Sequence, residues 1–283
     1  MEENETGPVA SCAAGSASDG ATSGAAVASD RVARDHAVRV IQVRQSVFAS
    51  NDRAADELRG ELRRRGTFLL NLMSSPGAGK TTTLARTIEA LAPTLSIGVM
   101  EADIDSDVDA RAMAAAGVPA VQLHTGGMCH LDAAMCRQGL AELDAVAAAV
   151  GRDHLDLAIL ENVGNLVCPA EFDTGASVNV AILSVPEGDD KPLKYPLMFE
   201  VCDVVLVNKM DVAPYFDFDL ARCEEHVLAR NPEARVLPIS AKTGEGVGAW
   251  ASWLAEAVRS WQSGSFAKLA PKNSAAAHYP QEG

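Results

Sequence analysis

Short apolar runs recur along the chain, and helix-length segments of mixed polarity separate them. The runs lie at residues 67–73, 97–100, 120–123, 155–160, 178–185, 204–207 and 236–239. Continuous apolar runs of this kind are typical of strands that are buried on both faces. Strands that alternate with helices form mainly parallel sheets. The pattern therefore predicts an α/β fold with a mainly parallel, doubly wound sheet.

Apolar residues also recur at helical spacing on either side of this strand region. Before it, the segment at residues 32–65 carries such residues, and Asn51-Asp52 can cap a second helical piece within it. The spaced residues are Val40, Val43, Val47, Leu58 and Leu62. After it, Trp250, Leu254 and Trp261 fall on one face of a helix at 247–261, which indicates packing on the core. We expect an N-terminal helical segment of two pieces and a final core-packing helix.

The two ends of the chain differ from the middle in composition. Residues 1–29 are mostly Ala, Ser, Gly, Asp and Glu, with almost no large apolar side chains. Such a segment cannot bury enough surface to offset the entropy of ordering it. From residue 263 onward the apolar periodicity is lost. We predict one folded domain over residues 32–262, between disordered tails at 1–31 and 263–283.

Charge and hydropathy narrow the classes of partner. The formal net charge is -14 at pH 7, which repels a phosphate backbone. No run reaches the ~18 apolar residues that a membrane helix needs. The acidic N-terminus lacks the basic and apolar regions of a signal peptide. We therefore expect a cytoplasmic protein that binds neither nucleic acid nor membrane.

A loop rich in Gly and Ser follows the first apolar run and precedes helix-forming residues. From residue 74 to residue 82 it reads Ser-Ser-Pro-Gly-Ala-Gly-Lys-Thr-Thr. Between a strand and a helix, backbone N–H groups of such a loop bind phosphate oxygens, Lys80 supplies positive charge, and the Thr81 hydroxyl can bind Mg²⁺. We predict a P-loop that binds nucleotide through Pro76, Gly77, Ala78, Gly79, Lys80, Thr81 and Thr82.

Asn208-Lys209-Met210-Asp211 directly follows the apolar run at residues 204–207. A carboxylate there can accept hydrogen bonds from guanine N1–H and from its exocyclic amine, whereas adenine offers an acceptor at N1 and no 2-amino group. Asp211 is therefore predicted to select guanine, while Asn208 and Lys209 hold the loop and cover the ring. Ser240-Ala241-Lys242, after the last strand, is predicted to form the second base-contact loop.

The run at residues 155–160 ends in an acid, Glu161, and Gly164 follows three residues later. Glu161 is positioned to hold Mg²⁺ or its water. The Gly164 N–H can approach the γ-phosphate because no Cβ obstructs it, so this loop should sense hydrolysis. We find no Gln or Arg in the sequence pattern that would orient water or stabilise the transition state, so unaided hydrolysis should be slow.

Asp103 follows the run at residues 97–100, where a switch segment would supply another Mg²⁺ ligand. It is the first of four alternating acids, Asp103, Asp105, Asp107 and Asp109. A calcium loop is excluded, because Val108 and Ala114 stand where that loop needs Gly and a bidentate Glu. The outer acids can equally form a solvated loop. The predicted catalytic set is Lys80, Thr81, Asp103 and Glu161.

Cys129-His130 and Cys168 lie in two loops that follow predicted strands. Thiolate and imidazole suit borderline metals such as Ni²⁺ or Zn²⁺, and three ligands per chain leave room for a second subunit to complete the site. Buried free cysteines more often only fill space, and this interpretation stays open for a single Cys-His pair. A second Cys on the loop of Gly164 favours the metal site. We assign Cys136, Cys202 and Cys223 to packing.

Several of these segments together resemble the HypB family of SIMIBI-class GTPases, over roughly residues 40–260. The matching segments are residues 51–66, 71–82, 125–133, 161–169, 190–196, 208–211 and 214–219. The most specific are Thr-Gly-Gly-Met-Cys-His-Leu-Asp-Ala at 125–133 and Glu-Asn-Val-Gly-Asn-Leu-Val-Cys-Pro at 161–169. The resemblance implies a GTP-hydrolysing metallochaperone that delivers nickel during [NiFe]-hydrogenase maturation.

The resemblance also implies a set of ligands and partners. Cys129, His130 and Cys168 would bind Ni²⁺, or Zn²⁺ at the same site, near the interface of a GTP-dependent homodimer. A HypA-type accessory protein and the hydrogenase large subunit would be partners. Two features depart from the family pattern: the tail has only Cys12 and no His before His36, and Ala102-Asp103 replaces the usual Gly-Asp. The first makes nickel storage by the tail doubtful.

Two alternatives remain at this point. One is a nickel chaperone GTPase of the urease-accessory type, which shares the fold. The other is a metal-storage or scaffold module in which the nucleotide is structural. Residues 125–133 and Cys168-Pro169 favour the hydrogenase relative over the urease-accessory type. Phosphate release that depends on Lys80 would exclude the storage or scaffold module.

Overall fold

The computed structural model describes residues 39–42, 48–103 and 117–266. The chain divides into two units, residues 1–35 and 36–283, and every described residue belongs to the second. The predicted tail at residues 1–31 lies outside the described residues, as does the part of the predicted C-terminal tail beyond Phe266. Asp105, Asp107 and Asp109 lie outside them too.

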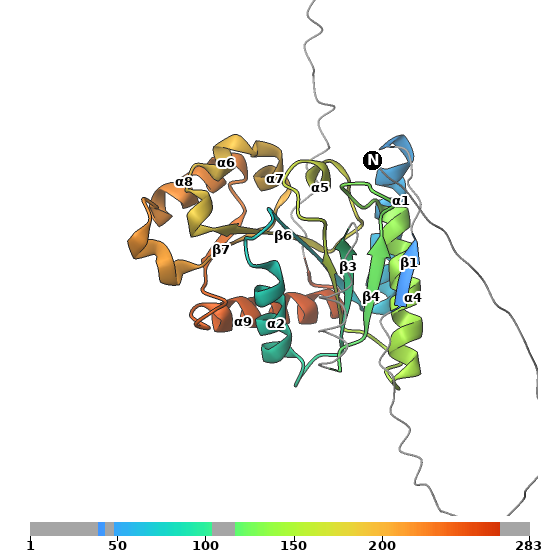
Figure 1. Cartoon of the computed structure of the whole chain (residues 1–283). Helices are drawn as coiled ribbons and strands as arrows, with labels where there is room; N and C mark the ends of the chain where they lie inside the picture. Colours follow the sequence, from blue (N-terminus) through green and yellow to red (C-terminus); the bar gives the residue numbers. More distant parts are fainter. Residues whose placement is uncertain (1–38, 43–47, 104–116, 267–283) are drawn as a thin grey trace, which may run out of the picture. The chain divides into compact units, whose positions relative to one another are not determined.

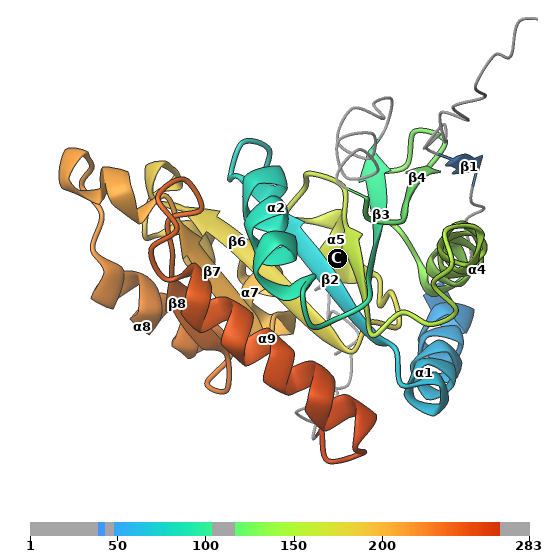
Figure 2. The same ribbon diagram turned by 90° about the horizontal axis from the view of Figure 1, so that it is seen from below.

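Eight strands of the described chain form one sheet, in the order β1-β4-β3-β5-β2-β6-β7-β8 (Figures 1 and 2). The strands are β1 (Arg39–Gln42), β2 (Phe68–Ser74), β3 (Ile97–Asp103), β4 (Ala120–His124), β5 (Leu157–Glu161), β6 (Val178–Ser184), β7 (Val204–Asn208) and β8 (Arg235–Pro238). Every neighbouring pair is parallel. After β2 the chain adds β3 and β4 on one side, returns to place β5 between β3 and β2, and then adds β6 to β8 on the other side, so the predicted doubly wound sheet is confirmed. Ligands of such sheets bind at the carboxyl ends of the strands where the winding reverses.

Helices cover both faces of this sheet. They are α1 (Phe48–Arg65), α2 (Lys80–Leu91), α4 (Ala133–Ala149), α5 (Cys168–Glu171), α6 (Lys191–Lys194), α7 (Pro196–Val201), α8 (Leu220–Arg230) and α9 (Val247–Gln262), with 3₁₀ turns η1 (Val185–Glu187) and η2 (Met210–Tyr215). α2 and α9 lie together on one face (Figure 2). There, Trp250 Nε1 donates to Thr87 Oγ1 at 2.9 Å, and Trp261 meets Phe68 edge to face. α1, α4, α7 and α8 cover the other face.

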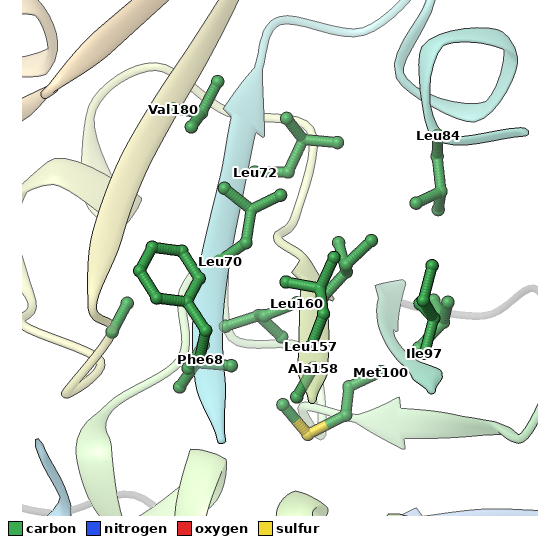
Figure 3. Packing of buried hydrophobic residues seen from close by; sticks show 14 of the residues in the cluster. Phe68, Leu70, Leu72, Leu84, Ile97, Met100, Leu157, Ala158, Leu160 and Val180 are labelled. Atoms are coloured by element: carbon green, nitrogen blue, oxygen red, sulfur yellow. The ribbon is translucent and has the colours of Figure 1, made fainter. Parts of the chain in front are cut away.

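The core consists of apolar strand residues packed between these layers. Figure 3 shows Phe68, Leu70 and Leu72 of β2 beside Leu157 and Leu160 of β5. A smaller cluster under α7 and α8 includes two of the cysteines that we assigned to packing. Cys136, Cys202 and Cys223 are all fully buried, which confirms that assignment. None of the helices in the described ranges is long and apolar enough to cross a bilayer.

The segment before β2 differs in part from the sequence prediction. Residues 39–42 form the edge strand β1, which pairs with β4, and α1 runs without a break through Asn51 and Asp52. The predicted cap between two helical pieces is therefore wrong, although a helix does precede β2. Asn51 is buried, donates to the Asp173 carbonyl and accepts from the Ala133 N–H, both at 2.9 Å. These tertiary bonds offset its weak helix propensity.

Candidate functional site

The predicted P-loop connects the end of β2 to the start of α2. Gly77 and Gly79 have φ angles of 76° and 96°, a region that side chains with a Cβ disfavour. A Cβ on Gly79 would lie 2.5 Å from Asn208 Nδ2, whereas one on Gly77 would meet nothing within 4 Å. Gly79 is therefore required where the Asn208 side chain, at the end of β7, lies against the loop, and Gly77 faces open space.

A cavity of about 590 Å³ opens above this loop at the carboxyl end of the sheet. Its lining residues are Pro76, Gly77, Gly79, Lys80, Thr81, Thr82, Glu101, Ala102, Glu161, Asn162, Val163, Gly164 and Lys209. Most of the predicted phosphate and Mg²⁺ residues are among them. Of the predicted catalytic set, Lys80, Thr81 and Glu161 line the cavity, and Asp103 is the last residue of β3. Glu101 also lines the cavity, and the sequence analysis assigned it no role.

The loop after β5 approaches the P-loop closely. A Cβ on Gly164 would lie 3.4 Å from both Lys80 Nζ and Pro76 Cγ, so a larger residue here would already touch the P-loop. Buried asparagines fix the base of the loop: Asn162 Nδ2 donates to Asn71 Oδ1 on β2, and Asn71 Nδ2 donates to Asn179 Oδ1 on β6, both at 3.0 Å. The loop therefore starts from a rigid point at the centre of the sheet.

The two predicted base loops are bonded to each other and to the P-loop. Asn208 Nδ2 donates to the Ala78 carbonyl at 2.9 Å, and Asn208 Oδ1 accepts from the Ala241 N–H at 3.0 Å. Lys209 has a left-handed φ of 64°, and its ammonium donates to the Gly77 carbonyl at 2.7 Å. Ser240 Oγ donates to Asp211 Oδ1 at 2.7 Å. Base and phosphate loops thus form one connected site, with Lys242 exposed at its edge.

The predicted metal ligands lie in two neighbouring loops. Thr125 Oγ1 donates to the Met128 carbonyl at 2.6 Å across a tight turn that leads to Cys129. Cys129 Sγ is 4.0 Å from His130 Nδ1. A hydrogen bond with Cys129, followed by burial, raises the pKa of the Cys168 thiol to about 11. The raised pKa means that a metal bound by Cys168 would have to displace the proton of that thiol.

His130 and Asn165 complete this arrangement. The His130 ring is 7% exposed and stacks on Phe172, with centroids 3.6 Å apart. Burial lowers the pKa of His130, which favours the neutral imidazole that binds metals. Its Nε2 is buried and has no hydrogen-bond partner among the described atoms. Asn165 Nδ2 lies 3.7 Å from Cys168 Sγ. Sequence reasoning assigned no role to Phe172 or Asn165. The stacking of Phe172 on His130 and the contact of Asn165 with Cys168 depend on how the loops pack, which has no sequence signature.

Within the ranges that the structure describes, no three His, Cys, Asp or Glu side chains form a ready metal cluster. The three predicted ligands lie close together, but a single chain does not present them in coordinating geometry. Their role as ligands stays a prediction. The other described histidines have different surroundings: His124 is the last residue of β4, His154 is an exposed neighbour of Asp156, and His226 Nδ1 contacts the Asp189 carbonyl at 2.9 Å.

Comparisons with known proteins agree on one family. Residues 68–238 match the family described as "CobW/HypB/UreG, nucleotide-binding domain". The chain is 47% identical to the hydrogenase maturation factor HypB of Azotobacter vinelandii over 216 residues, which are 76% of this chain and 69% of that protein. It is 43% identical to HypB of Escherichia coli (strain K12) over 219 residues, 76% of this chain and 72% of that protein.

Solved structures give the same result. The crystal structure of HypB from Helicobacter pylori in complex with nickel has a TM-score of 0.71 and 36% identity, and covers 78% of this chain and 98% of that one. HypB from Archaeoglobus fulgidus has a TM-score of 0.65 and 35% identity, and covers 74% of this chain and 99% of that one. With its nucleotide-binding fold and its P-loop, this chain belongs to the HypB family.

Proposed function

We propose that this chain is a GTPase that delivers nickel during [NiFe]-hydrogenase maturation and couples GTP hydrolysis to metal binding and dimerisation. The observation that carries the proposal is one short segment, residues 161–168. It begins at Glu161 in the nucleotide cavity and ends at Cys168, whose thiol lies beside Cys129 and 3.7 Å from Asn165 Nδ2. A segment with one end in each site transmits a displacement from one to the other.

The P-loop residues provide the phosphate-binding part of the reaction. Backbone N–H groups at the start of α2 and the Lys80 ammonium bind the β- and γ-phosphates. The Thr81 hydroxyl and the Glu161 carboxylate, with Asp103, are oxygen ligands of the kind that Mg²⁺ prefers. Mg²⁺, when bound, neutralises charge on the phosphates. Neither Gln nor Arg is among the described residues that line the cavity, so unaided turnover should be slow.

Base selection rests on Asp211. One carboxylate oxygen accepts from Ser240 Oγ, which fixes the orientation of the carboxylate. The remaining acceptor capacity is available for guanine N1–H and the exocyclic amine. Adenine offers neither donor at the matching positions, so an adenine nucleotide would leave the carboxylate unpaired, and GTP is the substrate favoured by this loop.

Nickel is the cargo of the proposed cycle. Cys129, His130 and Cys168 supply two thiolates and one neutral imidazole, which suit Ni²⁺, with Zn²⁺ as the alternative occupant. GTP draws the Gly164 loop toward Lys80, and Asn165 passes this displacement to Cys168. Hydrolysis releases the loop and loosens the metal. A second chain completes the coordination in a GTP-dependent homodimer, and a HypA-type accessory protein and the hydrogenase large subunit are the proposed partners.

The relatives support this cargo and client. The Helicobacter pylori structure is a complex with nickel, and the curated relatives include hydrogenase maturation factors at 43–47% identity. A second client is favoured by two others: the Helicobacter hepaticus and Helicobacter pylori relatives are hydrogenase/urease maturation factors, at 45% and 36% identity. Urease assembly is therefore the alternative client for the same nickel chemistry.

The proposal is tested by following nickel and phosphate release together. Protein loaded with Ni²⁺ and GTP is mixed with a chromogenic chelator, and both products are followed with time. We expect nickel release to track phosphate release in the wild-type protein. Lys80→Ala should stop both releases. Cys168→Ala should no longer bind Ni²⁺ stoichiometrically, while phosphate release continues. Cys223→Ala, which removes a buried thiol on α8, is the matched control. Nickel release at equal rates with and without hydrolysis would refute the coupling.

A further inference from the structure

Glu101 is a buried acid beside the nucleotide site. It lies on β3, is 4% exposed, and lines the cavity together with Lys80, Thr81 and Glu161. β3 and β5 are neighbouring parallel strands, and their register pairs Glu101 with Glu161. Paired residues on such strands point to the same side of the sheet, about 4.8 Å apart. Two carboxyl groups therefore enter the cavity side by side.

The charges around this pair favour a divalent cation. In a poorly solvated site two carboxylates can both be ionised only beside positive charge, because they repel each other, and a bound polyphosphate adds further negative charge. Lys209 is engaged elsewhere, since its ammonium donates to the Gly77 carbonyl at 2.7 Å. Among the described residues that line the cavity, this leaves Lys80 as the other cationic side chain, and its single charge does not balance a polyphosphate as well as the two acids. A hard divalent cation with oxygen ligands does.

Gln122 provides an independent observation at the same place. It lies on β4, where the register pairs it with Glu101 on the side away from Glu161. Its side chain is fully buried, and neither amide atom has a hydrogen-bond partner in the described structure. Unpaired buried amides are rare and costly. A carboxylate at Glu101 can accept from Gln122 Nε2, and a water molecule carried by a hydrated cation can donate to Oε1.

We propose that Glu101 is a further carboxylate in the coordination shell of the Mg²⁺ that accompanies the nucleotide, and that Gln122 is the positioning residue that orients it. The inference rests on the proposed guanine-nucleotide site. It adds a third acid to Asp103 and Glu161, and it extends the cation site by one strand toward β4. β4 leads directly into the turn before Cys129. The cation site would therefore be connected to the loop of Cys129 through β4, in addition to its connection to Cys168 through residues 161–168.

The test measures how Mg²⁺ slows the release of a fluorescent GDP analogue. Release rates are recorded against Mg²⁺ concentration for the wild type, Glu101→Gln, Gln122→Met and the control Glu89→Gln, an exposed acid on α2. Because even the loss of a residue outside the coordination shell typically weakens metal binding by about 10–100-fold, loss of the Glu101 ligand in Glu101→Gln should require at least about tenfold more Mg²⁺ for the same slowing. Gln122→Met should need a smaller excess, and the control should match the wild type.

Release in EDTA distinguishes a cation ligand from a structural residue. Without a cation the Glu101 carboxylate only repels phosphate, so Glu101→Gln should release nucleotide more slowly than the wild type. A folding defect would speed release both in EDTA and in Mg²⁺, and would overturn the inference. The inference would also be overturned if Glu101→Gln needed the same Mg²⁺ concentration as the wild type. The proposed function would stand in that case. If the wild type retained no guanine nucleotide, the proposed function itself would fail.

Discussion

Buried side-chain amides hold the nucleotide site together at the scale of single residues. Asn208 bonds the P-loop carbonyl of Ala78 and the N–H of Ala241 at once. Below the loop of Gly164, Asn162 bonds to Asn71 on β2, and Asn71 bonds to Asn179 on β6. The sequence motif identified Asn208 as the residue that holds the base loop. It gave no reason to assign Asn71, because a single Asn in an apolar strand has no local signature of its partner.

Replacing Asn208 by Ala should destabilise the protein even without nucleotide. The change leaves the Ala78 carbonyl and the Ala241 N–H without this side chain, in a site where Asn208 is 2% exposed. We expect the free energy of unfolding to fall by roughly 2–3 kcal/mol. Urea denaturation of the nucleotide-free protein measures this. Lys242→Ala, at an exposed position in the second base loop, should change it by less than about 0.5 kcal/mol.

At the scale of secondary structure, the sequence predicted the strands that carry the site to within a few residues. The apolar runs ending at Met73, Leu160 and Val207 correspond to β2, β5 and β7, because buried parallel strands must be continuously apolar. The segment at residues 39–42 was assigned to a helix and forms a strand instead. Its pairing with β4 is a contact between distant parts of the chain, and periodicity over a short segment does not report such contacts.

Gly164 tests the loop that joins the two sites. A Cβ at this position would lie 3.4 Å from Lys80 Nζ and Pro76 Cγ, which is already contact, so Gly164→Ala should leave the loop no room to move closer to the γ-phosphate. We expect kcat for GTP hydrolysis to fall at least about tenfold, the effect of losing roughly 1.4 kcal/mol of transition-state stabilisation. Affinity for GDP should stay close to the wild-type value, because GDP lacks the γ-phosphate. Gly248→Ala, on α9 with no atom within 4 Å of the added Cβ, is the control.

An ion pair fastens α8 to the corner between η1 and α6. Arg222 Nη2 donates to Asp189 Oδ2 at 2.6 Å, and the Asp219 N–H donates to the same oxygen at 2.9 Å. The hydrogen bond from Arg222 is the largest cause that lowers the pKa of Asp189. A lowered carboxyl pKa contributes stability above the unfolded pKa, and this contribution is lost as pH falls through the folded pKa.

Asp189→Asn should therefore cost stability at neutral pH and less in acid. We expect a loss of about 1 kcal/mol at pH 7, kept small because Arg222 is half exposed. The difference between wild type and variant should shrink as pH falls below about 4, the ordinary pKa of Asp. Urea denaturation at pH 7 and pH 3 compares them. A difference that stays constant over this range would show that the charge of Asp189 does not stabilise the fold.

At the scale of the whole molecule, the fold places predicted residues from distant segments around one cavity. Motif spacing was enough to find Lys80, Thr81 and Glu161, because the carboxyl ends of parallel strands meet at one edge of a sheet. It was not enough to find Glu101, whose importance depends on the register between β3 and β5. The stacking of His130 on Phe172 likewise depends on how the two loops pack.

The central claim is that the nucleotide site and the thiol-imidazole site are energetically coupled through residues 161–168. Coupling between two ligands is reciprocal, so the nucleotide must change nickel affinity by the factor by which nickel changes nucleotide affinity. The most direct measurement is a calorimetric nickel titration of the protein loaded with GDP and with a non-hydrolysable GTP analogue, with Cys223→Ala as control and Gly164→Ala as the uncoupled variant. We expect nickel dissociation constants that differ at least about fivefold between the two states in the wild type and converge in Gly164→Ala. Equal dissociation constants in the two nucleotide states of the wild type would contradict it.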